Sequence, residues 1–366
     1  MTYVYEQSSR GGFGRAMPSG EFIESVMHWH FSPTTGSPFW LRKAKEFDFD
    51  PLADVRTPQD LKLFPDIADE LRNVPVGDLV PRGYGADPEI YAVYDSGGTT
   101  GAPKRLVFMA DWMNLLMEWS SRDLDTRGYR HGSNWLALVP SGPHLFGDFT
   151  AEMVRRRGGF RFTIDMDPRW VKECVRIGDK VAAARYMSHL VAQTEDVLRT
   201  QDIAVMVVTP PLLEQISRNS ELVELINRKI ELIIWGGAHM GSDTRRVFRT
   251  ELFPDISFYG YYGSVTMLGT SVERAGLAAD DPCVFDTFSP YIFLSVVDPD
   301  TRTEVAYGER GRVIMNHVSK SMLLPNNLER DLAVRVRAPE GGIGDSVADI
   351  RPISALSGNP VIEGVY

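Results

Sequence analysis

Short apolar runs that alternate with segments of helical period constrain the fold of this chain more than any other feature. The runs are bounded by Gly and Pro; they are IYAVY (90–94), WLALVP (135–140), IAVMVVTP (203–210), ELIIWGG (231–237) and ISFYGYYG (256–263). Runs of this kind are typical of buried parallel strands. Helices are predicted between them, at 111–123, 170–178, 180–199, 212–227 and 243–253. The alternation predicts an α/β fold in which helices cover both faces of a parallel sheet.

The two ends of the chain depart from this alternation. Residues 1–88 hold short helices and turns, among them a helix around 21–31 and a shorter one that Thr57 caps and Pro58 begins. Residues 281–366 predict a small antiparallel unit, with a hairpin through Asp298-Pro299-Asp300. We expect one large domain over residues 1–366. Its subdivisions are this helical region, a first α/β lobe at 89–200, a second lobe at 201–280, and the β unit.

Composition argues against several classes of function. The chain has 49 Asp and Glu against 39 Lys and Arg, and its net charge of −10 repels nucleic acid. Cys174 and Cys283 are far apart and lack zinc-ligand spacing, which excludes a disulfide framework and a structural zinc. No apolar stretch is long enough to cross a bilayer, and the amino terminus lacks a signal-peptide pattern. These features predict a soluble, cytoplasmic protein with no membrane partner.

One loop carries the strongest chemical signal. Residues 94–104 read YDSGGTTGAPK and lie between apolar runs. Its glycines let backbone N–H groups approach a ligand, its hydroxyls can donate to phosphate oxygens, and Lys104 adds a positive charge. It is not a Walker loop, because Pro103 precedes the lysine and RLVFM (105–109) alternates like a strand instead of beginning a helix. We predict a triphosphate-binding loop that joins two strands; the alternative is a flexible surface hairpin.

The segment SGGTTGAPK (96–104) resembles the phosphate loop of the adenylate-forming superfamily of acyl-CoA synthetases, nonribosomal peptide synthetase adenylation domains and luciferases. Residues 37–67 resemble the phenylacetate-CoA ligase branch, and the chain is also similar to adenylating proteins of phenazine antibiotic biosynthesis. The resemblance runs in order over nearly the whole chain. It implies the large N-terminal-type domain of this superfamily, with two parallel-sheet α/β lobes and a small β-barrel-like unit.

The resemblance also implies the ATP site. The loop and Lys104 would bind the β- and γ-phosphates, the GGA segment at 236–238 would lie against adenine and acyl groups, and Tyr262 would stack on adenine. Asp331 would accept from the ribose hydroxyls. The ATP- or AMP-binding residues implied are Ser96, Gly97, Gly98, Thr99, Thr100, Gly101, Lys104, Gly236, Gly237, Ala238, Tyr262, Gly263 and Asp331. Three alternatives stay open: a plain turn at 236–237, a register that starts at Tyr259, and an ordinary surface pair at Arg330-Asp331.

His144 is the candidate for the acid substrate. It comes after the strand WLALV, and a histidine among glycines at the carboxyl end of a parallel strand can meet an anion. The resemblance places this segment against the carboxylate substrate. It implies catalytic roles for His144 and Lys104, and substrate contacts from His144, Gly236, Gly237 and Gly263. The alternative is a hydrogen-bonded structural histidine.

Metal binding departs from the family pattern. In the segment from Tyr262 to Thr266, Val265 replaces the family's phosphate-binding Thr, and Thr266 replaces its magnesium-binding Glu. We therefore predict no metal ligand in this segment and a Mg²⁺ held mainly by ATP phosphates and water. Glu273 is the nearest acidic residue that could substitute.

Only 35 residues follow Asp331, where the resemblance implies a hinge and a mobile C-terminal domain. The hinge pattern is eroded to Gly344-Asp345-Ser346-Val347, and none of the eight lysines follows Asp331. We expect the mobile C-terminal domain to be absent. Adenylate formation should be slow, because the α-phosphate lacks a preorganised cation. Thioester formation with coenzyme A should be very weak or absent.

The favoured function is the activation of an aromatic or heteroaromatic carboxylic acid, such as the phenazine acid griseoluteate, to its acyl-adenylate. ATP and Mg²⁺ are the expected cofactors. The aromatic residues of the predicted strands suit a flat ring; they are Trp235, Phe258, Tyr259, Tyr261 and Tyr262. The expected partners are the small acid and an acceptor or downstream biosynthetic enzyme, and a homodimer is left open. The rival function is a weak or inactive relative that binds nucleotide or the acid as a carrier or accessory subunit.

Overall fold

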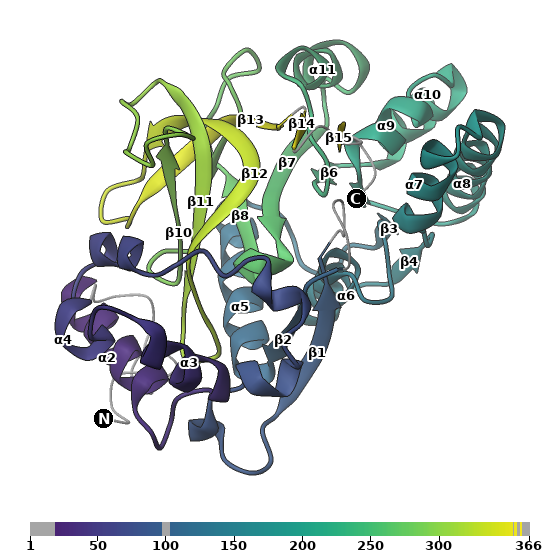
Figure 1. Cartoon of the computed structure of the whole chain (residues 1–366). Coiled ribbons are helices and arrows are strands. Elements are labelled where there is room, and N and C mark those ends of the chain that lie inside the picture. Colours follow the sequence, from purple (N-terminus) through teal and green to yellow (C-terminus); the bar gives the residue numbers. More distant parts are fainter. Residues whose placement is uncertain (1–18, 97–102, 354, 357–358, 361–366) are drawn as a thin grey trace. The chain divides into compact units, whose positions relative to one another are not determined.

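The computed structural model describes residues 19–96, 103–353, 355–356 and 359–360. The chain forms two compact units, each assembled from several segments (Figure 1). Unit 1 consists of Met1–Trp119, Ser264–Thr270 and Asp286–Val347. Unit 2 consists of Ser120–Gly263, Ser271–Phe285 and Ala348–Tyr366.

Unit 1 combines short helices with antiparallel strands. Its α-helices and helical turns are α2 (Ser19–Phe31), α3 (Pro38–Lys43), η1 (Ala44–Glu46), α4 (Pro51–Asp54), η2 (Pro58–Leu63), η3 (Glu70–Arg72), η4 (Val76–Leu79), η5 (Arg82–Tyr84) and η7 (Val265–Met267). Its strands are β1 (Ile90–Asp95), β2 (Arg105–Met109), β10 (Ile292–Val297), β11 (Arg310–Val318) and β12 (Leu323–Arg337). Strand β1 pairs antiparallel with β2, and β11 pairs antiparallel with both β10 and β12.

Aromatic packing holds the helices of unit 1 on its strands. The buried Trp40 on α3 contacts Phe31, Phe39 and Phe64, with ring centroids 5.1–5.8 Å apart. Its indole Nε1 donates to the carbonyl of Leu323 on β12 at 3.0 Å. Rings at these separations add to the free energy of apolar burial, so this cluster fixes the helical region against β12.

Unit 2 contains the parallel sheet, with strands in the order β4-β3-β5-β6-β7. The strands are β3 (Trp135–Leu138), β4 (Arg161–Thr163), β5 (Val205–Val208), β6 (Leu232–Trp235) and β7 (Ser257–Ser264). Its helices are α6 (Leu145–Arg157), α7 (Pro168–Arg176), α8 (Lys180–Thr200), α9 (Pro210–Ile216), α10 (Ser220–Lys229), α11 (Ser242–Val247) and the π-helix η6 (Phe248–Leu252). Every residue of β3, β5 and β6 is buried, as expected for strands covered on both faces.

Several elements have residues in both units. They are α5 (Ala110–Thr126), β7, β8 (Gly269–Glu273), β9 (Val284–Asp286) and β13 (Asp345–Pro352). The two short strands β14 (Ala355–Leu356) and β15 (Asn359–Pro360) pair near the end of the described chain.

The predicted α/β class is confirmed, with one correction. Four of the five apolar runs form parallel strands of unit 2, but IYAVY forms β1, which pairs antiparallel with β2 and is only partly buried. The four-part subdivision of the chain stays a prediction. The capped start at Thr57 is confirmed, because Asp60 accepts from the Thr57 backbone N–H at 2.8 Å and the helical turn begins at Pro58. Among the described residues, no helix combines the length and apolar character needed to span a membrane.

Candidate functional site

The predicted phosphate loop joins two antiparallel strands. Two hydrogen bonds join the residues at its ends. The Ser96 N–H donates to the Lys104 carbonyl at 2.8 Å, and the Lys104 N–H donates to Ser96 Oγ at 2.9 Å. The expectation of a strand–loop–strand arrangement is confirmed. Residues 97–102 lie outside the described residues, and with them Gly97, Gly98, Thr99, Thr100 and Gly101 of the predicted site.

The side chain of Lys104 is a buried cation in unit 1. The residue is 9% exposed, and burial lowers the pKa of its ammonium group, while the carboxylate of Glu329 opposes this lowering. Within the described ranges, no ion pair to this ammonium is found. A buried charge without a partner is costly, so the site favours an anion.

The carboxylate of Glu329 on β12 lies beside the segment where the family pattern expects a metal ligand. The hydroxyl of Thr266 donates to Glu329 Oε1 at 2.5 Å. A second hydroxyl, Ser264 Oγ, is 2.8 Å from Thr266 Oγ1. Thr266 is 3% exposed, so its rotamer is held by packing as well as by hydrogen bonds. Sequence reasoning missed Glu329; the one signal was its place two residues before Asp331.

Asp331 lies on β12 two residues beyond Glu329. The pairing of β12 with β11 shifts register between Leu328 and Leu332, so both carboxylates lie in an irregular stretch of the strand. Arg312 on β11 donates through Nε to the Glu329 carbonyl at 2.7 Å, which fixes the backbone of β12 at this point. Unit 1 therefore pairs Ser96 with Lys104 and Thr266 with Glu329, the Glu329 carboxylate acts electrostatically on Lys104, and Asp331 lies on the same strand as Glu329.

Unit 2 holds the other predicted residues, at the carboxyl ends of its parallel strands. His144 comes after β3 and is the N-terminal cap residue of α6. The Gly236–Ala238 segment comes after β6, and Tyr262 and Gly263 lie near the carboxyl end of β7. The carboxyl ends of parallel strands share one edge of a sheet, which is where open α/β sheets bind ligands.

Glycine is required at 236 by the close approach of neighbouring groups. A Cβ there would lie 2.9 Å from the Tyr261 carbonyl oxygen and 3.4 Å from the ring of Phe146. Gly237 has a φ of +73°, which residues with a side chain rarely adopt. The bare backbone at 236–237 therefore has a structural reason as well as the predicted ligand role.

The three tyrosines of β7 differ in exposure. Tyr259 and Tyr261 are buried, and the Tyr259 hydroxyl donates to Asp123 at 2.5 Å. Tyr262, on the opposite face of the strand, is half-buried, with its ring 5.9 Å from that of Phe285. Tyr262 is thus the tyrosine whose ring is accessible, and the alternative register beginning at Tyr259 places a buried, hydrogen-bonded ring in the stacking position.

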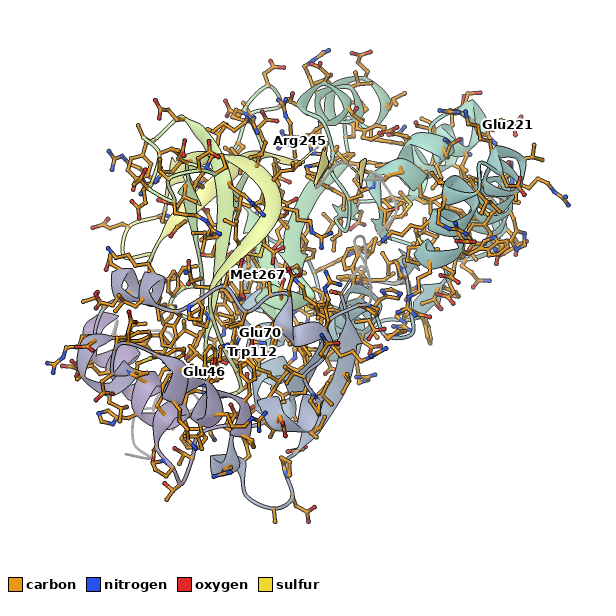
Figure 2. All side chains as sticks on the ribbon, in the orientation of Figure 1. Glu46, Glu70, Trp112, Glu221, Arg245 and Met267 are labelled. Carbon is orange, nitrogen blue, oxygen red and sulfur yellow. The ribbon has the colours of Figure 1, made fainter. Side chains whose placement is uncertain are left out.

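Glu273 is engaged in a buried ion pair. Its carboxylate pairs with Arg245, labelled in Figure 2, and accepts from the Gly260 N–H at 2.9 Å. The side chains of Arg245 and Glu273 are 2% and 5% exposed. A carboxylate committed to these two donors is poorly suited to replace a metal ligand. Within the part of the chain that the structure describes, no group of three or more His, Cys, Asp and Glu side chains could hold a metal ion.

Solved structures share this fold. The chain is similar to a crystal structure of 2-hydroxyisobutyryl-CoA ligase in an open conformation with 2-HIB-AMP and CoA, with a TM-score of 0.68 and 17% identity. That match covers 91% of this chain and 68% of the ligase chain. The same ligase in its thioesterification state gives a TM-score of 0.64 and 18% identity, over 93% of this chain and 70% of the ligase.

At this level of identity, the likeness shows the fold alone. It confirms the predicted α/β fold, which the chain shares with the matched part of this ligase. No protein-family model and no curated protein sequence matches the chain.

Proposed function

We propose that this chain is an ATP-dependent, AMP-forming ligase that activates a carboxylic acid as its acyl-adenylate. The observation that carries the proposal is Lys104, a buried ammonium group without an ion-pair partner among the described residues, at the end of a Ser-, Gly- and Thr-rich loop. The fold supports it, because the ligase with the same fold was crystallised with an acyl-adenylate, 2-HIB-AMP.

In the proposed reaction, a carboxylate oxygen of the acid attacks the α-phosphorus of ATP. The bond between that phosphorus and the oxygen that bridges to the β-phosphate breaks, and pyrophosphate leaves. Lys104 and the loop from Ser96 to Gly101 would bind the β- and γ-phosphates, and Asp331 would accept from the ribose hydroxyls. Mg²⁺ bound with ATP would neutralise phosphate charge and orient the leaving group.

Residues of unit 2 would bind adenine and the acid. Tyr262 would stack on adenine, and the backbone at Gly236, Gly237, Ala238 and Gly263 would let flat groups approach closely. His144 would contact the substrate carboxylate, and its place at the N-terminus of α6 favours an anion there because the helix dipole is positive at that end.

We further propose that the acid is aromatic or heteroaromatic, as a phenazine carboxylic acid is. Support comes from Phe146, whose ring lies 3.4 Å from where a Cβ at Gly236 would be, and from the neighbouring ring of Tyr261. Phe146 and Tyr261 lie 6.5 Å apart in an edge-to-face arrangement, and Phe146 is half-buried. Aromatic walls with one bare backbone segment suit a flat ring.

A pyrophosphate-exchange assay with a panel of aryl acids tests the proposal. Lys104→Ala should lower exchange by about 100-fold, because the phosphates lose a buried cation, while Lys62→Ala should leave it unchanged. Lys62 is an exposed lysine of the same unit and is the matched control. Equal exchange in the two variants would refute the role of Lys104. Binding of ATP or the acid without any exchange would instead support the rival carrier function.

For these 366 residues, we propose that the product is the adenylate and not the acyl-CoA. Support comes from the segment Gly344-Asp345-Ser346-Val347, which departs from the hinge pattern of the family that the sequence resembles. Incubation with ATP, an active acid and coenzyme A should yield the acyl-adenylate, with acyl-CoA at the uncatalysed background by mass spectrometry. Catalysed formation of acyl-CoA would contradict this part of the proposal and leave the adenylation itself intact.

A further inference from the structure

Two hydroxyls orient one carboxylate in unit 1. Ser264 Oγ is 2.8 Å from Thr266 Oγ1, and the Thr266 hydroxyl donates to Glu329 Oε1 at 2.5 Å. The Thr266 side chain is buried, and the β12 backbone at Glu329 is held by Arg312. The position of the Glu329 carboxylate is therefore fixed by contacts on both its side chain and its backbone.

The same carboxylate is the leading charged group that acts on Lys104. Among the surrounding charged groups, Glu329 has the largest effect on the pKa of Lys104, ahead of Arg330, Arg72 and Asp66. Lys104 is nine-tenths buried, yet its ammonium has no ion-pair partner within the described ranges. The Lys104 ammonium and the Glu329 carboxylate thus influence each other electrostatically without forming an ion pair.

A fixed carboxylate next to a phosphate site has an electrostatic consequence. It repels the phosphates of ATP when no metal is present, and it attracts a divalent cation that those phosphates carry. Mg²⁺ is commonly bound by one or two protein carboxylates together with substrate phosphates and water. One carboxylate without a cluster of further acidic ligands among the described residues fits this mode of binding.

Two other acidic residues are occupied by their own partners. Glu273, the alternative ligand considered from the sequence, is paired with Arg245 and with a backbone N–H. Asp66 accepts from the Ala68 N–H at 3.0 Å and from the Leu328 N–H on β12 at 3.4 Å. Glu329 accepts one hydroxyl through Oε1, which leaves Oε2 for another partner.

We propose that Glu329 is the protein carboxylate that ligates the divalent cation bound with the ATP phosphates, and that Thr266 orients it. This inference rests on the proposed function, since it requires ATP at the Lys104 site. Thr266 is then a positioning residue, and the ligand absent from the 262–266 segment is supplied from β12.

Binding measurements with ATP in the absence of the acid test the inference. Calorimetry would give the ATP affinity in Mg²⁺ and in EDTA for the unchanged protein and for Glu329→Gln. In the unchanged protein, Mg²⁺ should strengthen ATP binding by about tenfold or more. In Glu329→Gln, ATP should bind more tightly in EDTA and less tightly in Mg²⁺, so the ratio should fall by about tenfold. Glu340→Gln removes an exposed carboxylate of the same unit and should leave the ratio unchanged.

Each remaining outcome decides one of the two proposals. An unchanged ratio in Glu329→Gln, or an equal fall in Glu340→Gln, overturns the metal-ligand assignment while ATP binding stands. Failure of the unchanged protein to bind ATP in either buffer refutes the proposed function itself. Should Glu329→Gln not fold, Thr266→Val serves the same test, because it removes the donor that orients the carboxylate; a ratio equal to that of the unchanged protein would then overturn the inference.

Discussion

The buried ion pair of Arg245 and Glu273 in unit 2 bears on the stability of the fold. Both side chains are nearly inaccessible, and the Nε atom of Arg245 has no hydrogen-bond partner among the described residues. Glu273 also accepts from the Gly260 N–H on β7. Removing one partner of such a pair leaves an uncompensated buried charge, which costs more free energy than the intact pair contributes.

Glu273→Gln should therefore lower the free energy of unfolding by about 3–5 kcal/mol. The matched control is Glu173→Gln, which breaks the solvent-exposed pair with Arg176 on α7 and should change the stability little. Denaturant unfolding at neutral pH measures both. A Glu273→Gln protein that is as stable as the control but has lost pyrophosphate exchange would assign Glu273 to the reaction instead.

At the residue scale, local chemistry can be predicted from the sequence and distant pairing cannot. Ser96 and Lys104 stand out because a phosphate loop concentrates its donors in nine consecutive residues. Glu329 does not stand out, because its partner Thr266 is 63 positions away and a hydrogen bond across that distance leaves no local pattern. Glu273 is a candidate metal ligand only for its nearness in sequence, while its real partner Arg245 lies 28 positions back.

At the element scale, apolar runs predict where strands lie but not how they pair. The run WLALVP forms β3, a buried parallel strand, while IYAVY forms β1 of an antiparallel hairpin. Both runs are apolar and both precede turns, so composition cannot separate them. The distance to the next strand separates them instead. After β1 a strand begins again at Arg105, close enough for a hairpin, whereas parallel neighbours need a longer crossover.

At the scale of the whole molecule, the chain builds two units from interleaved segments. The residues Ser264–Thr270 belong to unit 1 although the residues on both sides of them belong to unit 2. Such interleaving depends on long-range contacts, which a pattern along the sequence does not contain. One network in unit 1 shows how far apart these contacts lie in sequence, since it joins α2 to η7 and β11.

This network contains two buried histidines. His30 Nε2 donates to the Ser319 carbonyl at 2.7 Å, and its Nδ1 has no partner among the described residues. His317 Nδ1 donates to the Met267 carbonyl at 2.9 Å, and its Nε2 accepts from the Ser319 hydroxyl at 2.7 Å. Trp112, labelled with Met267 in Figure 2, packs edge-on against the His317 ring at 4.5 Å. Burial lowers the pKa of His30 to about 4 and that of His317 to about 3.

These shifts predict that the molecule loses stability in mild acid. Both histidines are neutral in the folded protein above pH 5, while in the unfolded chain they take up a proton below about pH 6.5. The stability that the protein has with both histidines neutral is therefore fully present above pH 6.5. The free energy of unfolding falls as the pH is lowered from there toward the folded-state pKa values. At pH 5 the loss should be about 2 kcal/mol for each histidine. Carboxylates with ordinary unfolded pKa values titrate mainly below this window, so the interval from pH 6.5 to 5 isolates the histidines.

Denaturant unfolding at a series of pH values measures this slope directly. His30→Gln should reduce the slope between pH 6.5 and 5 by the equivalent of about one proton, because one group that binds a proton only in the unfolded chain is removed. His189→Gln, at an exposed position on α8, should leave the slope as it is. Absolute stability can fall in the His30 variant through lost packing, so the test rests on the slope alone. A slope that is equal in the unchanged protein and in His30→Gln would mean that His30 takes up its proton in the folded state, and the assignment of acid sensitivity to this buried network would be wrong.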